Sequence, residues 1–159
     1  MTILIKRLVF PSFVVLLVLL SACTNTDTQK TLMIDHPTGY EGVLVSGATS
    51  VIETSGYEEA LVSGGDKANE LIDALNGSEL VEASENELES KTADLEAPGS
   101  YRMLLYNKPS VNSTGEDIYP ILFYKDGTIQ VNQEGTSYFI AEPPKDLLTK
   151  LKADWDINF

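Results

Sequence analysis

The chain has 159 residues, with 11 Lys and Arg against 24 Asp and Glu, and a formal net charge of −13. Apart from the adjacent Lys6 and Arg7, its basic residues are scattered singly, whereas phosphate binding needs clustered Lys and Arg, so nucleic acid is excluded as a partner. One cysteine excludes a disulfide within the chain, and one histidine excludes a metal site built on several imidazoles.

The N-terminal segment has the order of an export signal. Two cations, Lys6 and Arg7, precede an uncharged apolar run over residues 8–20, and small residues follow the run. The run has 13 residues, whereas a membrane-spanning helix needs roughly 20. We therefore expect a cleaved signal peptide over residues 1–22 rather than an uncleaved anchor or a buried helix.

The end of this run, Leu20-Ser21-Ala22-Cys23, resembles the lipobox of bacterial lipoproteins at all four positions. The resemblance implies that a signal peptidase recognises Leu20, Ser21 and Ala22 and cuts before Cys23, whose thiol carries a diacylglyceryl group. Two acyl chains give stable anchoring, which one chain does not. The resemblance therefore implies a lipid-anchored protein in the cell membrane, facing outwards at a Gram-positive cell surface.

Removal of the signal leaves nine basic and 24 acidic residues, a net charge of −15. An anionic membrane surface repels such a body, so we expect residues 23–40 to form a tether that begins with the lipidated cysteine. Residues 41–159 are expected to form a single globular domain. The acidic surplus favours solubility, and a cationic partner or diffusely held divalent ions are the alternative use for it.

The first half of the domain is predicted to be a hairpin followed by a helix. Residues 31–40 are typical of a short edge strand or an ordered lead-in. Alternation from Val43 onwards predicts a strand, and Ser55-Gly56 predicts the turn before a second strand over residues 57–63. Apolar residues at helical spacing predict a helix over residues 66–75, with Asp66 as its N-cap and Gly77 in a left-handed C-cap.

The acid-rich stretch 79–97 predicts a short strand at Leu80-Val81 and then a surface loop or irregular helical turn. A strand over residues 101–106, apolar on both faces, precedes a polar loop over residues 108–116. A meander follows, with strands over residues 118–124, 128–131 and 136–140. Pro120 indicates an edge or a bulge, and Asp126-Gly127 indicates a hairpin turn.

Pro143-Pro144 is expected to open a last helix, because the first turn of a helix tolerates proline. The buried stripe predicted for this helix consists of Leu147, Leu148, Leu151 and Trp155. The sum of these elements is an α+β fold. We expect a two-layer sandwich in which a mainly antiparallel sheet, made from the hairpin and the C-terminal meander, is covered by two amphipathic helices.

Several local patterns over residues 48–155 resemble the YhfM-like small, uncharacterised lipoproteins of bacilli. They are Pro98-Gly99-Ser100-Tyr101 opening a strand, Leu122-Phe123-Tyr124-Lys125-Asp126-Gly127 at a turn, and Thr136-Ser137-Tyr138-Phe139-Ile140 before a terminal helix. The resemblance implies the same fold and an outward-facing, lipid-anchored location. It implies no activity and no site residues.

No convergent catalytic set is visible in the sequence. His36 stands beside Pro37 without a serine or cysteine in a glycine-flanked elbow, which is typical of a solvated loop histidine. The acidic run 82–89 lacks the spacing of a calcium loop, and Gly64-Gly65-Asp66-Lys67 is not a phosphate-binding loop. We therefore expect no catalytic residue, no metal and no cofactor.

These observations predict a non-catalytic domain that binds or modulates a target at the cell envelope, outside the membrane, and an envelope protein is the candidate partner. An envelope hydrolase with two close carboxyls, one of raised pKa, and a small ligand-binding lipoprotein are the alternatives. An edge strand near Val43 or Ile118 is a possible site for strand addition by a partner. Aromatic residues of the meander are expected in the core, or else in an exposed patch beside residues 108–116; they are Tyr101, Tyr106, Tyr119, Phe123, Tyr124, Tyr138 and Phe139.

Overall fold

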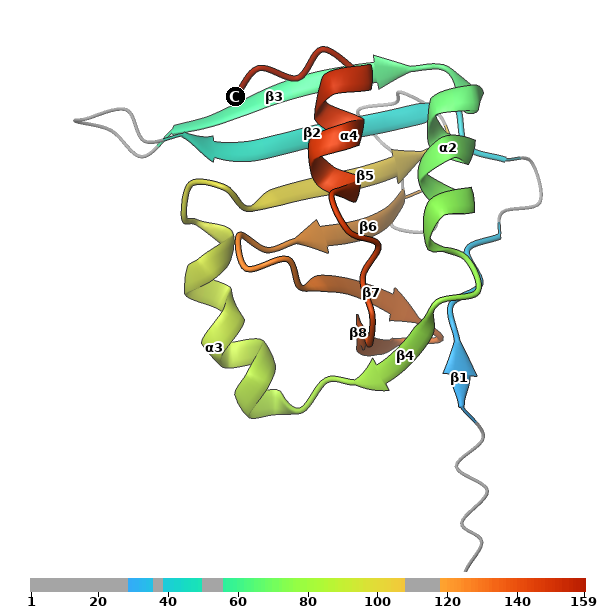
Figure 1. Cartoon of the computed structure of the whole chain (residues 1–159), viewed down its shortest axis with the longest axis vertical. Coiled ribbons are helices and arrows are strands. Elements are labelled where there is room, and N and C mark those ends of the chain that lie inside the picture. The colour runs from blue at the N-terminus through green and yellow to red at the C-terminus, as the bar shows by residue number, and fades with distance from the viewer. Residues whose placement is uncertain (1–28, 36–38, 50–55, 108–117) are drawn as a thin grey trace, which may run out of the picture.

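Figure 1 shows the computed structural model of the chain. The structure describes residues 29–35, 39–49, 56–107 and 118–159. In these ranges it has eight strands and three helices, which confirms the α+β class. The strands are β1 (Lys30–Thr31), β2 (Gly42–Thr49), β3 (Gly56–Ser63), β4 (Glu79–Glu82), β5 (Tyr101–Tyr106), β6 (Ile118–Phe123), β7 (Ile129–Gln133) and β8 (Thr136–Ile140). The helices are α2 (Gly65–Leu75), α3 (Glu85–Leu95) and α4 (Leu147–Asp154).

The strands form one sheet in the order β1-β4-β8-β7-β6-β5-β2-β3, and every neighbouring pair is antiparallel. The predicted pairing of β2 with β3 and the predicted meander β6-β7-β8 are both present. The predicted edges near Val43 and Ile118 are wrong, because β2 lies between β3 and β5, and β6 lies between β5 and β7. The outer strands of the described sheet are β1 and β3.

Pro120 lies inside this sheet without disrupting it. It pairs with Leu104 of β5, and the pairing of β6 with β7 begins one residue later, at Ile121. At the proline β6 is therefore paired on one side only, where a missing N–H is tolerated. The prediction of an edge is correct for this residue and wrong for the strand as a whole.

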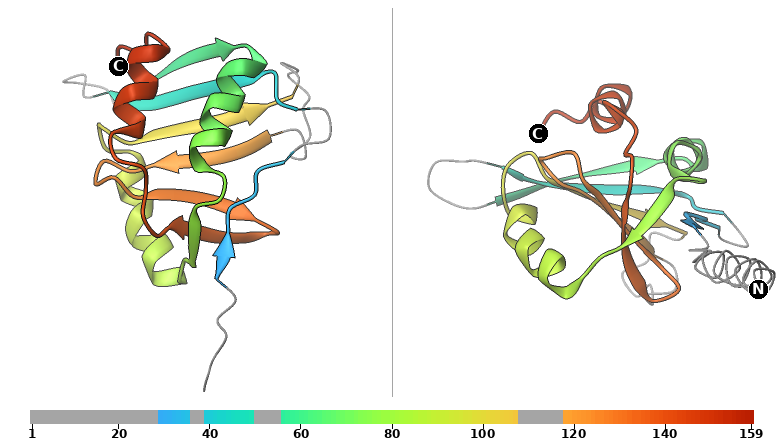
Figure 2. Two further views of the ribbon diagram at one scale, coloured as in Figure 1. Left: turned by 45° about the vertical axis from the view of Figure 1, so that its right-hand side comes forward. Right: turned by 60° about the horizontal axis from the view of Figure 1, so that its bottom comes forward.

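Helices α2 and α4 lie over the same face of the sheet (Figures 1 and 2). Helix α2 buries Ala68, Leu71 and Leu75, and α4 buries Leu147 and Leu151. These side chains share one apolar core with residues of β2, β5, β6 and β7; the strand residues include Val43, Val45, Met103, Leu105, Ile121 and Val131. Burial of this apolar surface is the main source of stability, at roughly 25 cal/mol per Å².

The packed part of the chain begins before residue 41. Leu32, Ile34 and Tyr40 are buried in the core, and Lys30 begins the edge strand β1. The Asn76 side chain holds this lead-in, because its Oδ1 accepts from Ile34 N at 2.7 Å and its Nδ2 donates to Ile34 O at 3.2 Å. Residues expected in the tether thus contribute to the core.

Three local predictions are wrong. Pro143-Pro144 does not open the last helix, because α4 begins at Leu147, directly after Asp146 in the left-handed conformation (φ 59°). The stretch expected to be a loop or irregular turn is helix α3, which Ser84 and Glu87 begin with a reciprocal capping box. Asp66 is not the N-cap of α2, because the helix starts earlier and Gly64 takes that position without a side-chain bond. Gly77 does have the predicted positive φ, at 83°, and this is the backbone conformation that glycine adopts at least cost.

Candidate functional site

The lipobox residues Leu20, Ser21, Ala22 and Cys23 lie outside the described residues. His36 and the loop 108–116 also lie outside them. Among the helices that the structure does describe, none is both long and apolar enough to span a membrane.

Most of the aromatic residues of the meander are buried and do not form an exposed surface patch. Five of the seven are buried, and Tyr119 and Phe139 are half-buried; the five are Tyr101, Tyr106, Phe123, Tyr124 and Tyr138. The exposed large apolar side chains in the described ranges come from elsewhere in the chain: Met33 (72% exposed), Leu61 (58%), Tyr57 (53%) and Val81 (52%). The alternative of an aromatic patch is therefore wrong for these residues.

The face of the sheet opposite α2 and α4, here called the open face, carries a row of apolar side chains. Leu61 of β3 pairs with Leu44 of β2, Leu44 pairs with Leu104 of β5, and Leu104 pairs with Pro120 of β6. Neighbouring strands lie about 4.8 Å apart, so this leucine row is about 14 Å long. Leu44, Leu104 and Pro120 are half-buried and Leu61 is exposed, so apolar surface remains accessible along the row.

The next row of the open face is mixed in character. Ser46 pairs with Glu59 on one side and with the exposed Arg102 on the other. The row continues through Leu122, Gln130, Phe139 and Val81. An apolar row beside a mixed row with single charges resembles the composition of protein interfaces, which are apolar at the centre and polar at the rim.

Tyr106 lies beside the leucine row, two residues along β5 from Leu104. It lies over Gly42, where an added Cβ would stand only 2.4 Å from the tyrosine Oη and 2.5 Å from Val62 O. Position 42 therefore requires glycine, because any side chain would displace the ring. The ring therefore occupies the open face over Gly42, next to the leucine row.

Helix α3 covers another corner of the open face (Figure 2). It buries no residue of its own and is held by polar contacts to the β6-β7 turn. Lys91 Nζ donates to the Asp126 carboxylate and to Thr128 Oγ1 (3.3 Å), and lies 5.0 Å from the centre of the Tyr124 ring. The hydrogen bond from Lys91 lowers the pKa of Asp126 to about 2. A second ion pair joins Lys125 Nζ to Asp94 at 2.9 Å.

The outer side of β3 is a free strand edge in the described part of the chain. The strand has eight residues and pairs with β2 without interruption. It contains no Pro, Lys or Arg, which are the residues that most often protect such edges. Because Tyr57 and Leu61 are also exposed, this edge offers both backbone groups and apolar side chains to a partner.

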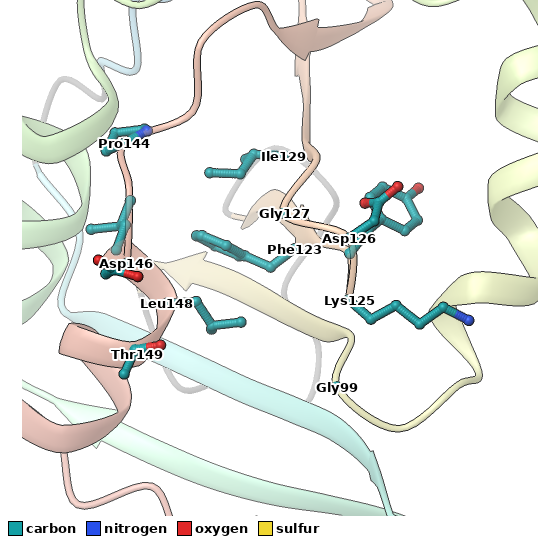
Figure 3. A pocket seen from close by; sticks show the side chains of 12 residues that line it. Gly99, Phe123, Lys125, Asp126, Gly127, Ile129, Pro144, Asp146, Leu148 and Thr149 are labelled. Atoms are coloured by element: carbon teal, nitrogen blue, oxygen red, sulfur yellow. The ribbon is translucent and has the colours of Figure 1, made fainter.

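A hollow of about 380 Å³ lies between the β6-β7 turn and the start of α4 (Figure 3). Phe123, Ile129 and Leu148 form its apolar part, and the Asp126 and Asp146 side chains lie on opposite sides of it. Its volume is in the range of small-ligand sites. Lys91 already neutralises Asp126, so Asp146 is the carboxylate in this lining without an ion pair among the described residues.

Carboxyl groups with shifted pKa values are all shifted downwards in the described ranges. A hydrogen bond from Trp155 lowers the pKa of Glu70, one from Ser84 lowers that of Glu87, and one from Lys30 lowers that of Glu134. Within the same ranges, no group of three or more His, Cys, Asp and Glu side chains could hold a metal ion. Each shifted carboxylate therefore serves a local structural contact.

No protein family, curated protein or solved structure matches the chain. The sequence did signal the open face in one place, since the strand over residues 101–106 is apolar on both faces. The alignment of Leu61, Leu44 and Leu104 in one row was not predicted, because it depends on the register between β3, β2 and β5.

Proposed function

We propose that the protein is a lipid-anchored, extracytoplasmic lipoprotein whose domain binds an envelope partner and has no catalytic role. The proposed binding role is supported by the leucine row, which consists of Leu61, Leu44, Leu104 and Pro120. Neither α2 nor α4 covers this row, whereas Val45, Met103 and Ile121 on the opposite face of the same sheet are fully buried. Accessible apolar rows of this kind are typical of interaction surfaces.

The proposed anchor rests on the N-terminal sequence, with Lys6 and Arg7 before an apolar run and Leu20-Ser21-Ala22 before Cys23. The proposed architecture is a two-layer sandwich in which α2 and α4 form the second layer. Helix α3 then lies outside this layer, against the end of the open face. An outward-facing anchored domain would present the rest of that face to other envelope proteins.

Mass spectrometry of the protein extracted from membranes tests the anchor. The expected product begins at Cys23 and carries a diacylglyceryl group on its sulfur. Cys23→Ala should leave the protein unlipidated and release it from the membrane fraction. Recovery of residues 1–22 in the mature protein, or of unmodified Cys23, would disprove the anchored location.

Crosslinking in intact cells tests the binding role. Leu44→Thr and Leu104→Thr place polar, β-branched residues in the leucine row and should reduce a specific crosslinked product at least tenfold. Met33→Thr is the matched control, because Met33 is an exposed apolar residue outside the row. The proposal fails if all three variants give the same product as the wild type, with unchanged circular dichroism.

A second candidate function is the binding of a small ligand in the hollow beside α4. Its volume of about 380 Å³ and its apolar base favour a small amphiphile, and Asp146 favours a positive charge on it. Leu148→Trp would fill the hollow. Protection of the wild type, but not of this variant, against thermal unfolding by a cationic amphiphile would support this candidate.

A further inference from the structure

The hydrogen-bonding pattern between β2 and β3 identifies which backbone groups of β3 face away from β2. Gly64 N donates to Glu41 O at 2.9 Å, directly after the last pair of the β2-β3 ladder. Bonded and non-bonded pairs alternate in an antiparallel ladder, so alternate residues of β3 direct their N–H and C=O groups away from β2. These outward residues are Tyr57, Glu59, Leu61 and Ser63.

No hydrogen bond within the described ranges uses these outward groups. The edge carries no Pro, Lys or Arg, and its charged residues are Glu58 and Glu59. It is eight residues long, its pairing with β2 shows no bulge, and Tyr57 and Leu61 are more than half exposed. Edges of this kind are templates for strand addition.

The charge of β3 restricts what can pair with it. Glu58 and Glu59 are both exposed, and because successive side chains alternate they lie on opposite faces of the sheet. No cation lies on β3 or β2. A strand that places two cations opposite these glutamates gains cross-strand pairing on both faces. A second copy of this acidic chain would instead bring like charges together.

The apolar residues of β3 indicate which side chains of an incoming strand would fit opposite them. Leu61 ends the leucine row on the open face, while Ala60 and Val62 are half-buried on the face covered by the helices. An apolar residue opposite Leu61 would lengthen the row by one strand. Residues opposite Ala60 and Val62 would extend the edge of the core, and β-branched residues suit both positions.

We propose that β3 accepts, as a ninth strand, an extended segment of a partner protein with two adjacent cationic residues inside a run of β-branched residues. This inference rests on the proposed binding role and specifies its partner. The segment pairs along the outward groups of β3, with its cations opposite Glu58 and Glu59. It also extends the leucine row of the open face.

A synthetic peptide Thr-Val-Ile-Val-Lys-Lys-Tyr with a fluorescent label tests the inference on the intact chain in detergent. Fluorescence anisotropy should show binding at least tenfold tighter than for the same peptide with Glu-Glu, and weaker binding at high salt. The double variant Glu58→Lys, Glu59→Lys should reverse this preference. Equal binding of both peptides by the wild type would overturn the charge assignment.

Backbone pairing is tested from both sides of the interface. Leu61→Pro removes an outward N–H that β2 does not use, so it should abolish peptide binding and leave the circular dichroism unchanged. Two peptides test backbone pairing without altering the protein. Each is N-methylated at alternate residues, so that one peptide is blocked along one of its hydrogen-bonding edges and the second peptide along the other edge. One of them should bind and the other should not, whereas equal binding of both would overturn strand addition.

Failure of strand addition would be distinguishable from failure of the proposed function. If Leu44→Thr and Leu104→Thr reduce the cellular crosslink while Leu61→Pro and the N-methylated peptides have no effect, the open face binds its partner without a ninth strand. Sedimentation velocity tests whether a second copy of this chain pairs with β3 instead. A dimer that Leu61→Pro dissociates would show that β3 pairs with a second copy, and would overturn the assignment to a basic partner.

Discussion

The two faces of the sheet come from the same strands, yet they differ in what they contact. On the covered face, Val45 and Met103 are completely buried under α2 and α4. On the open face, their chain neighbours Leu44 and Leu104 are only half-buried. The covered face therefore contributes most of the folding free energy. The open face retains accessible apolar surface, and we propose that this surface binds the partner.

The largest expected effect concerns the covered face. Leu71→Ala leaves a cavity under α2, where Leu71 is fully buried, and should lower the free energy of unfolding by about 2–5 kcal/mol. Leu61→Ala removes the same atoms from an exposed position and should cost less than about 1 kcal/mol. Urea unfolding of both variants measures the difference. Equal losses would contradict the distinction between the two faces.

The cap of α3 should have a smaller effect, confined to one corner of the open face. Ser84→Ala removes the side-chain half of the capping box and should cost about 1 kcal/mol. Hydrogen exchange should accelerate in α3 while α2 remains protected. Ser90→Ala is the matched control, because Ser90 is an exposed serine inside the same helix. Acceleration throughout the sheet would show that α3 is part of the core rather than attached to it.

The ion pair between Lys91 and Asp126 makes the attachment of α3 dependent on pH. The pKa of Asp126 is lowered in the folded state, so its contribution is complete above its unfolded value of about 4. The contribution is lost as the pH falls from about 4 to about 2. Because Asp126 is half exposed, the effect should be below about 1 kcal/mol.

Asp126→Asn should remove this part of the pH dependence, measured by urea unfolding between pH 2 and pH 6. Glu142→Gln is the control, because Glu142 is an exposed acid on the loop before α4. An unchanged pH profile in Asp126→Asn would contradict the assignment of the titration to this carboxyl.

The smallest expected effect concerns Tyr119, whose hydroxyl is buried without a hydrogen-bond partner among the described residues. Burial raises the pKa of Tyr119 to about 12. Tyr119→Phe removes the unsatisfied group and should change the free energy of unfolding by about 0–1 kcal/mol, towards greater stability. In Tyr124→Phe, the comparison variant, a bond to Gln130 Oε1 is lost, so stability should fall by about 1 kcal/mol. A clear loss in Tyr119→Phe would indicate a partner for its hydroxyl.

The sequence by itself determined the elements with strong local signals. Helix α2 follows from apolar spacing, the β6-β7 turn from Asp126-Gly127, and the β2-β3 pairing from alternation on either side of a turn. It also determined the strong acidic charge and the order of the N-terminal segment. Each of these depends on residues close together in the chain, where propensity and periodicity act directly.

Only the tertiary structure decided which strands are edges and which apolar residues remain accessible. Pro120 indicated an edge, yet β5 and β7 both pair with β6; in the described sheet the outer strands are β1 and β3, and β3 carries no Pro, Lys or Arg. The alignment of Leu61, Leu44 and Leu104 arises from the register of strands that are far apart in the sequence. Register and sheet order depend on long-range packing, and no local pattern in this chain specifies them.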